Sequence, residues 1–135
     1  MIKNIIEQWE NNKSELEHYF RTTEQYEYCG YQQIVVKLFE ICFTNADDYS
    51  GFDIDKMRVI DDGHYQGTKI FIIPKDTYQP SINDYITTHT YYGSCSGCDT
   101  LQSICEYNEG LPTEEQVKRY MTLALHLVQK LRWLE

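Results

Sequence analysis

The alternation of apolar and polar residues predicts two helices in the first third of the chain. Between residues 2 and 20, apolar side chains recur at intervals of three and four, the spacing of one face of an amphipathic helix. The adjacent Asn11 and Asn12 fall in the polar middle of this stretch and could break it in two. A second helical pattern covers residues 31–43 and follows Gly30. Residues 44–55 are rich in acidic and turn-forming side chains, so we expect a loop there.

The middle of the chain changes to a pattern that is typical of β-strands. Residues 57–61, 66–74 and 85–92 are rich in β-branched and aromatic side chains, and turn-forming segments separate them. Three short strands in succession predict an antiparallel meander. Its first turn falls at Asp62-Gly63 or at Gln66-Gly67.

Helices are predicted again in the last third. Residues 100–107 form a short helical candidate, and Thr113 with Gln116 three residues later is a capping box that begins a longer helix. The apolar stripe of this helix runs through Val117, Tyr120, Met121, Ala124, Leu127, Val128, Leu131 and Leu134.

The order of these elements predicts an α+β fold, in which a small three-stranded antiparallel sheet packs against N-terminal and C-terminal helices. Leu123, Leu125 and Trp133 lie outside the apolar stripe of the last helix, so that helix is expected to be covered on more than one side. A homodimer is compatible with this excess of apolar positions.

Length and composition narrow the class of protein. The chain has 135 residues and 16.1 kDa, the size of one domain, and no linker divides residues 1–135. Apolar residues make up 41%, which is too many for a disordered acidic tail. Lys and Arg number 12 against 21 Asp and Glu, so the net charge is −9. This charge argues against direct binding of nucleic acid, because such binding depends on cations that neutralise phosphates.

The compartment is inferred from the first residues and from the cysteines. Residues 1–10 contain only Lys3 as a basic residue and resemble no signal peptide, and no apolar run reaches the roughly eighteen residues of a membrane span. The sequence therefore predicts a cytoplasmic protein that does not act at a membrane. Five cysteines are an odd number, and in a reducing cytosol each is by default a thiol.

The segment YYGSCSGCDTL at residues 91–101 is the part of the sequence that most suggests chemistry. Cys95 and Cys98 form a C-x-x-C motif between a predicted strand and a predicted helix. A thiolate at a helix start has a lowered pKa, which suits thiol redox chemistry. Two thiolates on a tight turn can also bind zinc if two further ligands are supplied. By sequence, the nearest further ligands are Cys105, His89 and His64.

Two other interpretations of the same segment stay open. Its glycines and serines could turn backbone N–H groups toward an anion, although Asp99 places a negative charge at the same helix start. Alternatively, the glycines only permit a tight turn and the cysteines are small buried groups. The sequence therefore leaves zinc as an alternative to having no cofactor, and it identifies no catalytic residue.

Acidic residues are concentrated in the first part of the chain. Residues 1–55 hold 11 acidic and 4 basic side chains, a net charge of −7. A field of one sign attracts a basic partner, and tyrosines offer large contact area with a polar tip. The expected partner-binding residues are Glu24, Glu27, Asp47, Asp48, Tyr49, Asp53 and Asp55, interleaved with Tyr26, Tyr28, Tyr31 and Phe52.

At YYGSCSGCDTL the sequence resembles small phage and prophage proteins of low-GC Gram-positive bacteria. The similar stretch includes DDGHYQGTKIFII before the motif and MTLALHLVQKL after it, so it covers about the second half of the chain. The resemblance brings no activity or catalytic residue with it. It implies a phage accessory protein, a setting in which small acidic proteins bind and block host enzymes. We therefore expect a non-enzymatic, anti-CRISPR-like inhibitor of a basic host protein, such as a CRISPR effector or another nuclease. The alternative is a zinc or thiol-redox protein.

Overall fold

The fold is α+β, as the residue pattern predicts. The computed structural model describes residues 2–23, 30–46, 51–63, 67–93, 101, 104 and 110–134. Its helices are α1 (Ile2–Thr22), α2 (Tyr31–Ile41) and α4 (Glu114–Gln129). Its strands are β1 (Arg58–Asp61), β2 (Gly67–Pro74), β3 (Tyr85–Tyr92) and β4 (Arg132–Trp133), and two short 3-10 turns are η1 (Ile54–Lys56) and η2 (Ile82–Asp84).

The strands form one antiparallel sheet in the order β1-β2-β3-β4. The three predicted strands are confirmed to within one residue at each end. The prediction of a three-stranded sheet is wrong by one strand, because β4 pairs with β3 through Trp133 opposite Ile86. The chain continues this pairing, since the N–H of Leu134 donates to the carbonyl of Tyr85 at 2.8 Å.

The last helix is shorter than its apolar stripe predicts. Lys130 ends α4, and its N–H still donates to the carbonyls of Leu127 and Val128. The Arg132 guanidinium donates to the carbonyls of Leu131 and Gln129, at 2.7 and 3.3 Å, which satisfies acceptors at the end of the helix. Leu131 is buried all the same. Its apolar side chain is therefore buried beside the sheet, although the helix has already ended.

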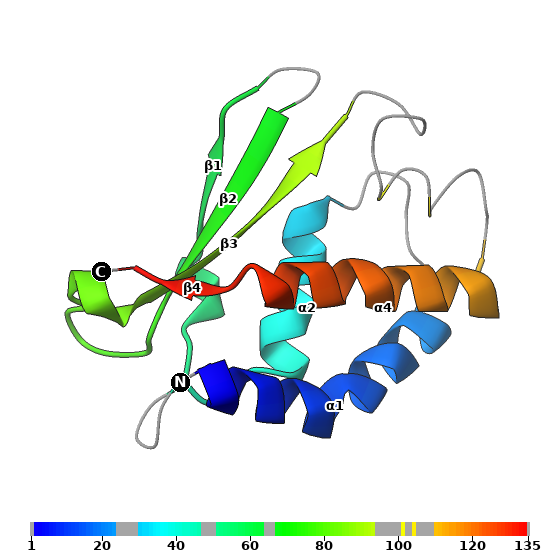
Figure 1. Ribbon diagram of the computed structural model, residues 1–135, viewed down its shortest axis with the longest axis horizontal. Helices are drawn as coiled ribbons and strands as arrows, with labels where there is room; N and C mark the ends of the chain where they lie inside the picture. The colour runs from blue at the N-terminus through cyan, green and yellow to red at the C-terminus, as the bar shows by residue number, and fades with distance from the viewer. Residues whose placement is uncertain are drawn as a thin grey trace.

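Helices cover one face of the sheet (Figure 1). α1 and α4 lie side by side and run in opposite directions, and α2 crosses both. Phe71 and Ile73 of β2 and Ile86 of β3 point into the core between sheet and helices, whereas Ile70 and Ile72 alternate to the other face. The Thr88 hydroxyl, also on the core face, donates to the carbonyl of Leu127 at 2.8 Å and fixes α4 against β3.

Aromatic packing joins the first and last helices. The Phe20 ring of α1 stacks on the Tyr120 ring of α4, with centroids 5.0 Å apart and planes 12° apart, and both side chains are buried. At the surface, Arg21 donates to Glu114 at 2.8 Å, and this hydrogen bond lowers the pKa of the Glu114 carboxyl. An exposed ion pair of this kind contributes little stability, so the aromatic contact holds the two helices together.

α1 is continuous through Asn11 and Asn12. The Asn12 amide donates to the carbonyl of Cys42 at 3.1 Å. One turn earlier, the buried Gln8 amide donates to the carbonyl of Asn45 at 2.8 Å and accepts from its N–H at 3.1 Å. The polar middle of this helix therefore binds the segment that follows α2.

Candidate functional site

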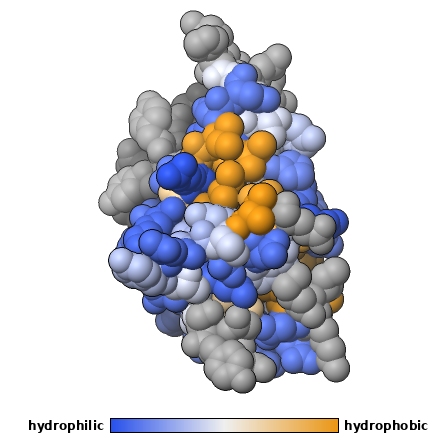
Figure 2. All heavy atoms as spheres, turned by 90° about the vertical axis from the view of Figure 1, so that its left-hand side faces the viewer, coloured by the Kyte–Doolittle hydropathy of each residue, from blue (hydrophilic) through white to orange (hydrophobic). Residues whose placement is uncertain are grey.

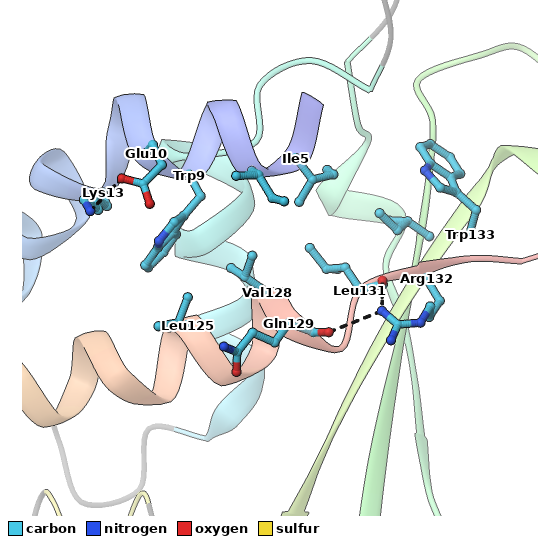
Figure 3. Close-up of a pocket in the computed structure, with 12 residues that line it drawn as sticks. Ile5, Trp9, Glu10, Lys13, Leu125, Val128, Gln129, Leu131, Arg132 and Trp133 are labelled. Atoms are coloured by element: carbon cyan, nitrogen blue, oxygen red, sulfur yellow. Dashed lines mark hydrogen bonds and ion pairs between the residues drawn. The ribbon is translucent and has the colours of Figure 1, made fainter. Parts of the chain in front are cut away.

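An apolar groove of about 460 Å³ lies between the start of α1, the end of α4 and β4 (Figure 3). Its polar lining residues are Glu10, Lys13, Gln129 and Arg132. Grooves of this volume with mostly apolar walls are the usual form of a binding site. The apolar walls are formed by Ile5, Ile6, Trp9, Ile86, Leu125, Val128, Leu131 and Trp133.

Two tryptophans stand at opposite ends of this groove, with Ile5, Val128 and Leu131 between them (Figure 3). Trp9 is buried against the core. The Trp133 ring stacks on Phe52 with centroids 5.8 Å apart. Indole rings offer large, rigid contact area, which is why tryptophan is enriched in binding sites.

The Trp133 side chain carries a donor that the described residues leave unsatisfied. Its Nε1 is buried and has no hydrogen-bond partner among them. The Lys75 Nζ lies 5.1 Å from the centroid of the same ring, a cation–π distance. A buried indole N–H without an acceptor costs free energy.

Among the described lining residues, charged groups stand only at the ends of the groove. Glu10 and Lys13 form an ion pair at 2.8 Å near Trp9, and Arg132 lies near Trp133 (Figure 3). Glu10 is the one carboxylate among the described lining residues, and it is already paired with Lys13. The described lining therefore combines apolar walls with a few charged groups, as binding pockets commonly do.

The structure describes two of the residues predicted to bind a partner, Asp53 and Asp55. Asp53 lies 3.5 Å from the Lys56 Nζ, and Asp55 is exposed in η1. The prediction that Tyr31 contributes to this surface is wrong, because Tyr31 is buried and its hydroxyl accepts the N–H of Leu101 at 3.0 Å. Glu24, Glu27, Asp47, Asp48 and Tyr49, with Tyr26 and Tyr28, lie outside the described residues.

The interleaved Phe52 is half-buried and packs edge-on against Phe39, with centroids 5.0 Å apart. Phe52 also contacts Trp133, so it links the predicted acidic segment to the wall of the groove.

The cysteine motif can be placed only in part. Cys95, Cys98, Cys105 and His64 lie outside the described residues. His89 is described on the sheet face that the helices leave uncovered, edge-on to Tyr91 with ring centroids 5.9 Å apart. No group of three potential metal ligands occurs within the described ranges. The zinc and thiol-redox hypotheses therefore remain predictions of the sequence.

A metal and thiol assay of reduced protein tests those hypotheses. A zinc site predicts about one zinc per chain and protected thiols, both lost in Cys95→Ser/Cys98→Ser. A redox site predicts a dithiol that the same double substitution removes. Cys42→Ser is the control, because burial, with a smaller contribution from the charge of Glu15, raises the pKa of the Cys42 thiol to about 12 and makes it inert. Metal-free protein in which Cys95 and Cys98 react freely as separate thiols, with no dithiol activity, would contradict both hypotheses.

The groove could not be predicted from the residue pattern, because its walls come from segments far apart in the chain. Ile6, Trp9 and Trp133 are visible as large apolar residues, but the apolar stripe predicts that Trp133 lies on a helix. Pairing of β4 with β3 places it in the groove instead.

No family model, curated protein or solved structure matches the chain. Among the helices that the structure describes, none combines the length and the apolar character needed to cross a membrane.

Proposed function

We propose that this protein is a non-catalytic binding protein whose groove holds apolar side chains from a segment of a basic partner protein. The observation that carries the proposal is the groove with a tryptophan at each end and, in the part of the lining that the structure describes, charged groups confined to its rim. Buried aromatic anchors dominate the affinity of protein interfaces. Here the tryptophans form walls that an inserted apolar side chain would contact.

The charge of the chain supports a basic partner. The net charge is −9, and exposed carboxylates such as Glu7, Glu15 and Asp55 form no ion pair with other described residues. Such a field speeds the encounter with a cationic protein and adds a salt-dependent contribution to affinity. In this proposal the groove supplies the apolar anchor, and the acidic segment around residues 47–55 supplies the attraction.

The setting of the partner follows from the resemblance to phage proteins. Enzymes that handle nucleic acid present basic surfaces, which an acidic protein can occupy. We therefore propose a host defence enzyme, such as a CRISPR effector or another nuclease, as the protein that this chain binds and inhibits in the bacterial cytosol.

A pair of synthetic peptides tests the binding chemistry. A helical peptide of leucine and lysine should bind and shift the fluorescence of Trp9 or Trp133, whereas a leucine and glutamate peptide of equal length should not. Ile6→Asn, which puts a polar amide in the groove wall, should weaken binding about tenfold, equivalent to about 1.4 kcal/mol. Ile82→Asn is the matched control, since Ile6 and Ile82 are 51% and 58% exposed and Ile82 does not line the groove. Equal binding of both peptides, or equal losses in both variants, would refute the proposal.

The same titration tests the acidic segment. Neutralising Asp47, Asp48, Asp53 and Asp55 to asparagine should weaken binding of the lysine peptide about tenfold and flatten its salt dependence, with folding intact. The control neutralises four carboxylates elsewhere and changes the net charge equally: Glu7→Gln, Glu15→Gln, Glu17→Gln and Glu115→Gln. If the control weakens binding as much, total charge and not this segment determines the affinity.

A further inference from the structure

β1 is an edge strand of the described sheet, and its outer edge is directed away from β2. The N–H of Asp62 donates to the carbonyl of Thr68 across the β1–β2 pair, at 3.2 Å. In an antiparallel ladder, alternate residues direct their backbone groups to the same side. Ile60 therefore bonds toward β2, and Val59 directs its N–H and C=O outward.

An apolar patch adjoins this edge. The register places Ile60 of β1 opposite Ile70 of β2, and Arg58 opposite Ile72, all on the face that the helices do not cover. Ile60 is half exposed, and Ile70 is also exposed. Figure 2, which looks at the side where β1 and β2 lie, shows apolar residues gathered into a continuous patch. Short length and charges commonly protect an edge strand, and β1 has both in the exposed Arg58 and Asp61, but Ile60 presents an apolar side chain between them.

We propose that β1 pairs antiparallel with β1 of a second copy of this chain, so that two sheets join across a two-fold axis. The axis passes between Ile60 of one copy and Ile60 of the other. This register keeps the apolar patches of both copies on one face and makes them continuous. Val59 of each copy then lies opposite Asp61 of the other copy and is positioned to exchange backbone hydrogen bonds with it.

Charge complementarity selects this register. With Ile60 on the axis, the exposed Arg58 of each copy faces the exposed Asp62 of the other, and opposite charges across two strands are favourable. Moving the axis to Val59 places Arg58 opposite Ile60 and loses both charge pairs. Moving it to Asp61 places like charges directly opposite each other, which is unfavourable.

The dimer is independent of the proposed partner site, because no residue of β1 lines the groove. A four-residue strand gives a small interface, so the dimer should be weak and depend on protein concentration. Sedimentation velocity over a wide range of concentrations should show a monomer–dimer equilibrium.

Substitution of Ile60 locates the interface. Ile60→Lys sets two lysines against each other on the axis and should raise the dissociation constant at least tenfold, while Leu111→Lys should leave it unchanged. Leu111 is a suitable control because it is 58% exposed against 50% for Ile60 and precedes α4, whose start lies across the molecule from β1 (Figure 1). A protein that is monomeric at every concentration would overturn the proposal, and so would a dimer that Ile60→Lys leaves intact.

Charge reversal tests the register separately. Arg58→Asp places a carboxylate opposite Asp62 of the second copy and should weaken the dimer about tenfold, and the same is expected of Asp62→Lys. The double variant Arg58→Asp/Asp62→Lys restores opposite charges and should recover the dimer. Circular dichroism confirms that each variant is folded. Folded single variants that dimerise normally, or a folded double variant that does not recover, would overturn this register.

Discussion

Replacement of Phe20 by alanine should lower the free energy of unfolding by about 3–5 kcal/mol, as expected for a phenylalanine removed from a packed core. The Phe20 side chain is fully buried and stacks on Tyr120, so its loss leaves a cavity between α1 and α4. Urea titration followed by circular dichroism measures the change.

Tyr78→Ala is the control for this prediction. Tyr78 is 95% exposed, and a surface substitution of this kind should alter the free energy of unfolding by no more than about 0.5 kcal/mol. A loss below about 1 kcal/mol for Phe20→Ala would mean that α1 is not seated on α4 as described.

Trp133→Ala should be the next most destabilising change, with a loss of about 2–3 kcal/mol. This value is below the usual cost for a core tryptophan because Trp133 is only partly buried. The substitution removes the stacking on Phe52, the cation–π contact with Lys75 and one end wall of the groove. Unfolding titrations and binding of the lysine peptide should therefore both be affected.

Trp133→Phe distinguishes the contribution of the aromatic ring to stability from that of the indole N–H group. Phenylalanine keeps an aromatic face against Phe52 but lacks the buried Nε1 donor, which has no partner among the described residues. Removing an unsatisfied donor recovers part of the stability lost with the smaller ring, so this variant should be much closer to the wild type than Trp133→Ala. If both variants lose the same stability, the indole N–H contributes a favourable contact.

Most of the secondary structure could be predicted because its signals are local. The Thr113 and Gln116 capping box begins α4 as expected, with the Gln116 N–H bonded to the Thr113 hydroxyl at 3.2 Å. The first three strands follow from runs of β-branched residues between turns. Leu101 and Ile104, the two described residues of the helix predicted at 100–107, are both buried.

The fourth strand could not be predicted because its evidence is not local. Leu131 and Leu134 continue the helical period of Leu127, so the sequence alone favours a longer helix. The open edge of β3 supplies backbone partners that a sequence pattern does not show, and Leu134 bonds to Tyr85 there.

The candidate site shows the same limit. The prediction of the acidic segment rests on a count of charged residues. Of the residues predicted in that segment, the structure describes Asp53 and Asp55. The groove arises only when α1, α4 and β4 pack together, so no single stretch of sequence carries its signature.

The docking of α1 on α4 also affects how the protein is made. Arg21 and Glu114 meet across 93 residues of intervening sequence, whereas each hairpin of the sheet joins neighbouring segments. On the ribosome, α1 emerges before α2 and the sheet, and α4, which covers its apolar side, emerges after them. The nascent chain therefore displays Leu16 and Phe20 until α4 has been made, a state in which exposed apolar surface invites chaperones or aggregation. The rate of folding should be set by this long-range closure and not by the hairpins.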